Sequence, residues 1–148
     1  MKNFGLKFHH LGLATDNPKL SLKILKNLGY KPIKTRTNKN YNVKNIICAS
    51  ENHPTVEIVA KMGGKSPIDN IVKKNKNLIY HICYSSNDLK KTIAMIEKKN
   101  FSIINIFKSY LSPFEGVDAS FYFLKGIGII EIMNFKQKKV GLCGSNQM

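Results

Sequence analysis

Two histidines and two glutamates, each inside a short apolar segment, could together hold a metal ion. They are His10, Glu57, His81 and Glu131. In the segment 55–61, TVEIVAK, strand alternation places Val56 and Ile58 on one face and the carboxylate of Glu57 on the other. A carboxylate in an apolar strand is costly to bury unless it is paired or bound to a cation. Such an imidazole and carboxylate set suits Zn, Ni, Co, Mn or Fe better than Ca or Mg.

The four residues occupy equivalent positions of an internal repeat. The segment FHHLGLATDNPKLSLKILKNLGYKPI aligns without a gap with IYHICYSSNDLKKTIAMIEKKNFSII, which pairs His10 with His81. The later segments TVEIVAK and IIEIMNF pair Glu57 with Glu131. If the two halves pack about a pseudo-twofold axis, the four side chains converge on one divalent metal ion.

Each half of the repeat predicts the same order of elements, β-α-β-β-β. One helix is predicted after a cap at Asp16 or Asn17, and the other after a cap at Asn87 or Asp88. Strands after the helices are predicted over 31–35, 43–49 and 55–61, and over 102–107, 119–124 and 127–135. The predicted fold class is therefore α+β, with two tandem β-α-β-β-β modules whose curved mixed sheets enclose the metal site.

The length of 148 residues fits one compact domain. We assign residues 1–62 to the first module, 63–77 to a linker with a short helix, 78–135 to the second module and 136–148 to a polar tail. Apolar residues make up 43% of the chain and charged residues 22%, as in soluble globular proteins. No segment approaches 18 consecutive apolar residues, and the start lacks the apolar stretch of a signal peptide. These features favour a cytoplasmic protein that does not bind membranes.

The net charge is strongly basic, because 24 Lys and Arg face 9 Asp and Glu for a formal charge of +15. Apart from Arg36 the basic residues are lysines, and they are scattered without a dense block. Nucleic-acid readers usually concentrate arginine with interleaved aromatic residues. The charge therefore argues against a nucleic-acid partner and favours an anionic small molecule such as a carboxylate, a phosphate or coenzyme A.

Several other residues have ordinary interpretations. Cys48, Cys83 and Cys143 are too widely separated for a CxxC motif and are predicted to be free thiols, with Cys83 buried. His9 should point away from the face of His10 by strand alternation, which favours packing or an interface over metal binding. Aromatic residues that could line a substrate pocket or belong to the core are Tyr110, Phe114 and Phe121 to Phe123.

These motifs resemble those of the vicinal oxygen chelate superfamily, which includes glyoxalase I, methylmalonyl-CoA epimerase, extradiol dioxygenases and fosfomycin and bleomycin resistance proteins. HHLGLATDN is similar to the opening strand of the family, and GIIEIMNF is similar to its closing ligand strand. GKSPIDNIVKKNKNLIYHICY closely resembles the inter-module stretch of methylmalonyl-CoA epimerases. The likeness covers about residues 6–135. It implies a homodimer and the metal ligands His10, Glu57, His81 and Glu131, the same four that the repeat indicates.

The resemblance implies a divalent-metal-dependent isomerase or lyase. Such an enzyme stabilises an enolate or enediolate during proton transfer α to a carbonyl or thioester, as methylmalonyl-CoA epimerase or lactoylglutathione lyase does. Glu131 is expected to be a ligand and the base, with Glu57 as its partner on the opposite side of the ion.

Two departures and two alternatives accompany this interpretation. Some epimerases of the family carry a further catalytic glutamate on the third strand of the first module, where this chain has Asn45. The segment SYLSPFEGVDASFYFL also differs from their glycine-rich basic stretch. One alternative is a non-catalytic small-molecule-binding or resistance protein on the same fold. The other is a ring-cleaving dioxygenase, whose site of two histidines and one carboxylate does not need Glu57.

Overall fold

The computed structural model describes residues 2–114 and 116–135, so the predicted tail with Cys143 lies outside the described residues. The elements in chain order are η1 (Lys2–Gly5), β1 (Leu6–Thr15), α1 (Pro18–Asn27), β2 (Lys31–Asn38), β3 (Val43–Ala49), β4 (Val56–Lys61), α2 (Asp69–Asn75), β5 (Asn77–Ser86), α3 (Leu89–Lys98), β6 (Ile103–Leu111), β7 (Asp118–Leu124) and β8 (Gly128–Asn134). The order β-α-β-β-β thus occurs twice, with α2 between the two repeats. This confirms the predicted fold class.

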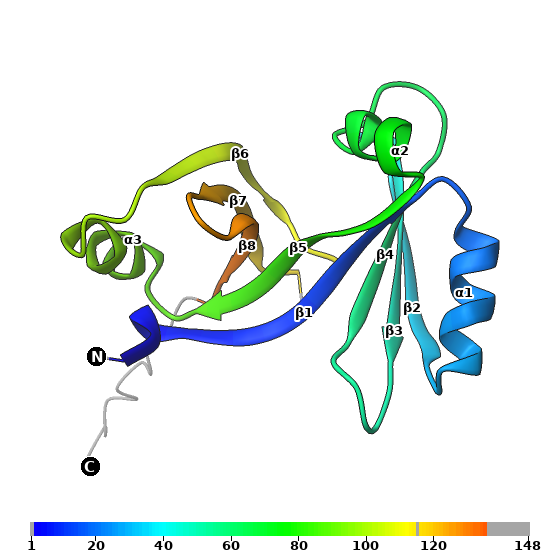
Figure 1. The fold of residues 1–148 in the computed structure, drawn as a ribbon, viewed down its shortest axis with the longest axis horizontal. Helices are drawn as coiled ribbons and strands as arrows, with labels where there is room; N and C mark the ends of the chain where they lie inside the picture. The colour runs from blue at the N-terminus through cyan, green and yellow to red at the C-terminus, as the bar shows by residue number, and fades with distance from the viewer. Residues whose placement is uncertain (1, 115, 136–148) are drawn as a thin grey trace, which may run out of the picture.

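One sheet of eight strands carries the whole fold, in the order β2-β3-β4-β1-β5-β8-β7-β6. The first strands of the two repeats, β1 and β5, are antiparallel neighbours at its centre. Each of them is parallel to the last strand of its own repeat, β4 or β8. Figure 1 shows β1 and β5 running side by side across the middle, with one half of the sheet curving away at either end.

The pairing of β1 with β5 contains two irregularities. Phe8 faces Tyr84 and His10 faces Cys83, so His9 is an extra residue on β1. Gly12 faces His81 and Leu13 faces Ile79, so Tyr80 is an extra residue on β5. Such β-bulges bend a strand and turn a side chain from its regular direction. His9 and Tyr80 are equivalent in the internal repeat, and each directly precedes a candidate metal ligand.

Equivalent caps begin α1 and α3. The Asn17 side chain accepts a hydrogen bond from the backbone N–H of Leu20, and the Asp88 side chain accepts one from the N–H of Lys91. Pro18 at the start of α1 has no N–H that would need a partner. In each repeat the cap is therefore the second of the two predicted residues.

Both faces of β4, in the first half of the sheet, are covered. On the outer face, Leu25 of α1 shares a buried cluster with Val56 and Ile58 of β4. On the inner face, Ile68 and Val72, at and within α2, share a cluster with Val59 of β4. Side chains alternate along a strand, so the side chain of residue 57 is on the inner face with Val59. Residues 56–60 of β4 are therefore apolar on both faces except for this one carboxylate.

A pair of hydroxyl side chains joins the first strand of each repeat to its helix. In the first repeat, Ser21 Oγ donates to Thr15 Oγ1 at 3.0 Å. In the second, the hydroxyls of Ser86 and Thr92 lie 2.9 Å apart. The Thr92 hydroxyl also donates to the backbone carbonyl of Phe4 at 2.9 Å, which ties α3 to the N-terminal segment.

We expect Thr92→Val to lower the free energy of unfolding by about 1–3 kcal/mol, because valine fills the same space but leaves the Phe4 carbonyl without its hydroxyl donor. Thr92 is buried, so water has little access to the place of that donor. Urea unfolding followed by circular dichroism measures the change. Ser21→Ala removes the equivalent hydroxyl at a half-buried position and should cost less. Equal costs for the two variants would contradict the prediction.

No helix within the described part of the chain has the length and apolar character needed to cross a membrane.

Candidate metal centre

The candidate ligands meet on the inner face of the sheet. They come from the four central strands β4, β1, β5 and β8 and are Glu57, His10, His81 and Glu131. One ligand atom of each lies within 4.8 Å of those of the others. His10 Nε2 lies 3.9 Å from Glu57 Oε2 and 3.9 Å from Glu131 Oε1, while His81 Nε2 lies 3.7 Å from Glu131 Oε2. All four side chains are buried, with at most 2% of any residue exposed.

Gly12 of β1 lies between two of the candidate ligands on the neighbouring strands. It is the Cα partner of both Glu57 on β4 and His81 on β5. A Cβ at this position would overlap the imidazole of His81, so glycine lets that ring lie across β1. The sequence interpretation missed Gly12, although a glycine inside a strand is a known signal of close approach by another group.

Cys83 occupies the equivalent position in the second repeat. It is the Cα partner of both His10 on β1 and Glu131 on β8. Its thiol donates to Glu131 Oε1 at 3.2 Å. Burial and the Glu131 carboxylate raise the pKa of Cys83, so the thiol keeps the proton that it donates. The predicted buried thiol therefore also holds one oxygen of a candidate ligand.

Burial keeps the two imidazoles neutral. It lowers the pKa of His10 to about 2, with nearby His81 and His9 adding to the effect. It also lowers the pKa of His81 to about 3. Neutral imidazole is the form that binds metal ions through a nitrogen lone pair.

Burial also works against negative charge in this cluster. Burial and the neighbouring carboxylate of Glu131 raise the pKa of Glu57 well above its usual range. A hydrogen bond from Asn45 Nδ2 to Glu57 Oε1, at 3.5 Å, acts in the opposite direction. Two buried carboxylates this close together need a cation to be stable as anions.

The side chains of the cluster fit a divalent ion. Among the residues that the structure describes, the buried side-chain atoms without a hydrogen-bond partner are His10 Nε2, Glu57 Oε2 and both ring nitrogens of His81. Ligand atoms about 2.1 Å from one ion lie about 3–4 Å apart. The separations of 3.7 to 3.9 Å in the structure fall in this range. Two nitrogens and two carboxylates are donors that suit Zn, Ni, Co, Mn or Fe.

A cavity of about 290 Å³ opens beside Glu57. Its size is close to the lower end of small-molecule sites. Asn45 and Glu57 contribute polar groups, and most of the remaining wall is apolar or aromatic. Tyr41 of the first repeat, Tyr80 of β5 and Phe107 of the second repeat all line it, so both repeats shape the space next to the candidate ligands.

The aromatic residues that the sequence left open between pocket lining and core have different surroundings. Phe121 lines the cavity. Phe114 stacks on the ring of His10, with centroids 4.3 Å apart and an interplanar angle of 18°. Phe123 is 44% exposed. The side chain of Tyr110 lies outside the described part of the structure.

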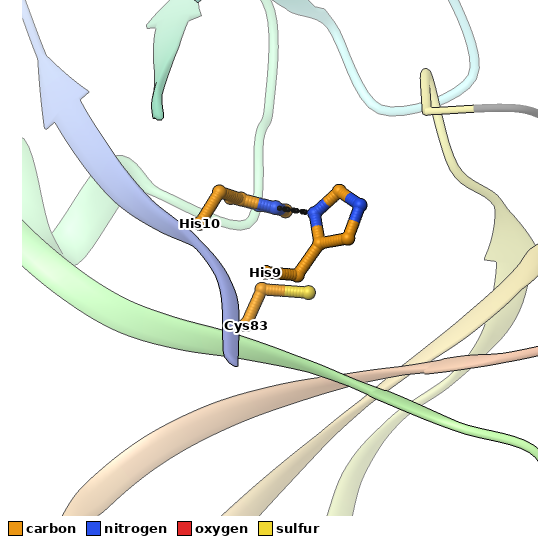
Figure 2. A group of neighbouring side chains, drawn as sticks. All are labelled: His9, His10 and Cys83. Carbon is orange, nitrogen blue, oxygen red and sulfur yellow. Dashed lines mark hydrogen bonds between the residues drawn. The ribbon is translucent and has the colours of Figure 1, made fainter. Parts of the chain in front are cut away.

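His9 does not point away from the site, and the expectation from strand alternation was wrong. The bulge in β1 breaks the alternation and turns the ring of His9 toward His10. Their Nδ1 atoms lie 2.8 Å apart. Figure 2 shows the hydrogen bond between these two nitrogens, with Cys83 close to both rings.

The chain is similar to methylmalonyl-CoA epimerases. A mitochondrial methylmalonyl-CoA epimerase of Dictyostelium discoideum is 30% identical over 101 residues, which are 67% of this chain and 60% of that protein. The match therefore spans less than two thirds of that relative. The structure of methylmalonyl-CoA epimerase from Mycobacterium tuberculosis has a TM-score of 0.70 at 14% identity and covers 86% of each chain. A Streptomyces coelicolor methylmalonyl-CoA epimerase variant in complex with 2-nitronate-propionyl-CoA has a TM-score of 0.66 at 15% identity, covering 89% of this chain and 98% of that one.

The family assignment comes from the sequence, because at these identities the solved structures show the fold alone. The family model of the Glyoxalase/Bleomycin resistance protein/Dioxygenase superfamily matches residues 9–124. The matched residues contain three of the four candidate ligands and most of both β-α-β-β-β repeats. The chain therefore belongs to the Glyoxalase/Bleomycin resistance protein/Dioxygenase superfamily, in agreement with the resemblance of its motifs.

Proposed function

We propose that this protein is a divalent-metal-dependent isomerase or lyase that moves a proton α to a carbonyl or thioester. Epimerase-like chemistry is the first candidate and lactoylglutathione lyase-like chemistry the second. The observation that carries the proposal is the buried cluster of two neutral imidazoles and two carboxylates beside a cavity. The similarity to a methylmalonyl-CoA epimerase supports the reaction class.

His10 and His81 would hold the ion through their nitrogen lone pairs, together with Glu57 and Glu131. When bound, a divalent ion supplies Lewis-acid stabilisation of the negative charge that develops on a carbonyl oxygen as the neighbouring carbon loses a proton. The mostly apolar and aromatic walls of the cavity would limit the access of water to that carbon.

The two carboxylates carry the proton in this proposal. Glu131 removes it, with Oε1 held by the thiol of Cys83. Glu57 lines the cavity, accepts a hydrogen bond on Oε1 from the amide of Asn45 and, in its protonated form, gives a proton to the carbon from the other side. Inversion of a stereocentre needs one group on each face of the carbon, and the two repeats each supply one carboxylate. Asn45 stands where some epimerases of the family carry a further catalytic glutamate. Its amide cannot accept the proton, so in this proposal only Glu57 and Glu131 transfer it.

We further propose an anionic small-molecule substrate, for which an acyl-CoA thioester is the first choice. It combines a carbonyl and an acyl group with phosphates, which suits an apolar cavity in a protein of net charge +15. One similar structure was solved with an acyl-CoA analogue. The homodimer, the cytoplasmic location and the lack of a nucleic-acid partner stay predictions from the sequence.

Metal analysis tests the foundation of this proposal. The purified chain, reloaded with a mixture of Co, Ni, Mn and Zn and then desalted, is expected to hold about one ion per chain. His81→Ala removes a buried ligand and should lower the content to background, whereas His53→Ala changes an exposed histidine and should not. Mass spectrometry measures both. A wild-type chain without stoichiometric metal would overturn the enzyme proposal and favour the alternative, a small-molecule-binding or resistance protein.

The substrate class is tested separately, in deuterated water with the metal-loaded chain. Deuterium uptake at the α-carbon of methylmalonyl-CoA would support the epimerase reaction. Conversion of the hemithioacetal of glutathione and methylglyoxal would support the lyase reaction instead. If the loaded chain changes neither compound, nor any other acyl-CoA with an acidic α-proton, the proposed reaction class is wrong.

A further inference from the structure

We infer that His9 positions the candidate ligand His10: His9 Nδ1 accepts a hydrogen bond from Nδ1–H of His10 and so directs the unprotonated Nε2 of His10 at the metal centre. This inference rests on the proposed metal centre. It gives His9 a positioning role and does not make it a ligand.

The bulge in β1 is what makes this contact possible. Neighbouring residues of a regular strand point to opposite faces, and the extra residue His9 escapes this rule. Phe114 then holds both rings, because it stacks on His10 and meets the ring of His9 edge-on with centroids 4.8 Å apart. The hydrogen bond thus joins two side chains that are already fixed by packing (Figure 2).

The positions of the nitrogens assign the donor. In a neutral imidazole one nitrogen carries the hydrogen and the other has the lone pair. The Nε2 of His10 lies 3.9 Å from the nearest oxygens of Glu57 and Glu131, which is too long for a hydrogen bond and suits an ion between them. The proton of His10 therefore belongs on Nδ1, where His9 Nδ1 lies 2.8 Å away as the acceptor. Metal-binding histidines commonly donate a hydrogen bond from the ring nitrogen that does not bind the metal.

His9, His10 and Cys83 could also be considered as a second metal site, because their ligand atoms lie within 4.8 Å of one another. The distance of 2.8 Å between the two Nδ1 atoms argues against it, since ligand atoms about 2.1 Å from one ion lie about 3–4 Å apart. The thiol of Cys83 is directed to Glu131 instead. His9 and Cys83 thus each support a different candidate ligand.

Nitrogen-15 NMR of the histidine-labelled full chain, freed of metal with a chelator, tests the assignment directly. We expect His10 to carry its hydrogen on Nδ1 and His9 to carry its hydrogen on Nε2. Single substitutions of the two histidines identify their signals. A proton on Nε2 of His10 would overturn the inference.

Metal affinity of matched variants gives the second readout. His9→Phe keeps a ring against Phe114 but removes the acceptor, and should weaken Co binding by about 10–100-fold in competition with a chelating dye. His9→Asn offers an oxygen near the place of Nδ1 and should restore most of the affinity. His53→Phe is the control, because His53 is exposed and stacks on Tyr30 with centroids 5.8 Å apart.

The outcomes separate this inference from the proposed metal centre. Equal affinities of wild type and His9→Phe, or equal losses in His9→Phe and His9→Asn, would overturn the positioning role. If the wild type binds no metal ion, the metal centre itself is wrong, and the inference fails with it. If His9→Phe does not fold, the NMR assignment of the wild type decides.

Discussion

Glu131→Gln is expected to lower α-proton exchange by the metal-loaded protein about 10²–10⁴-fold for the enantiomer whose proton Glu131 removes. Glutamine keeps the size of Glu131 and one oxygen donor, but it cannot accept a proton from carbon. The Glu131 side chain is fully buried, and its Oε1 accepts a hydrogen bond from the thiol of Cys83. Deuterium uptake by each enantiomer of methylmalonyl-CoA, compared at equal metal content, measures the loss.

Glu57→Gln is the matched control for this prediction. If one carboxylate serves each face of the substrate, each variant keeps exchange with the enantiomer that its remaining carboxylate can deprotonate. Both variants then lose interconversion of the enantiomers. Exchange of both enantiomers at the wild-type rate by metal-loaded Glu131→Gln would remove Glu131 from the proton transfer.

Gly12→Ala is expected to abolish stoichiometric metal binding and to lower the free energy of unfolding by about 1–3 kcal/mol. The added methyl group would overlap the His81 ring, which is buried. The ring must leave its position beside Glu131, and the candidate centre loses one ligand. Metal content and urea unfolding measure the two effects.

Gly126→Ala is the control that separates the loss of metal binding from the loss of stability. Gly126 has a φ of +99° and open space where a Cβ would be, so alanine there strains the backbone by about 1 kcal/mol and touches nothing near the site. We expect this variant to be less stable than the wild type but to bind one ion. Normal metal affinity in Gly12→Ala would show that the His81 ring is not held as the structure has it.

The order of elements could be predicted because its signals are local. The helix caps Asn17 and Asp88 and the alternation around Glu57 each depend on a few neighbouring residues. The lengths of the outer strands were less predictable. β2 extends to Asn38 and β6 to Leu111, beyond the predicted 35 and 107, because pairing with β3 and β7 continues where the apolar pattern ends.

The candidate site was predictable to the extent that the internal repeat determines it. Symmetry placed both histidines and both glutamates at equivalent positions, and the structure gathers their side chains. The direction of His9 and the need for Gly12 were not predictable in this way. Both depend on how β1 pairs with β5, a contact between residues far apart in the sequence.

The two bulges in the central pair of strands also limit how the chain can change in length. His9 adds one residue to β1 and Tyr80 adds one to β5, so the two strands begin and end in register, with Leu6 facing Ser86 and Thr15 facing Asn77. Deleting either extra residue alone would shift the pairing of β1 with β5 by one position at one end. The side chains of the shifted strand segment would then point to the opposite face of the sheet. Deleting both would restore the count but straighten both strands. The two halves of the protein are therefore not independent at their junction, and a change of length in one requires a compensating change in the other.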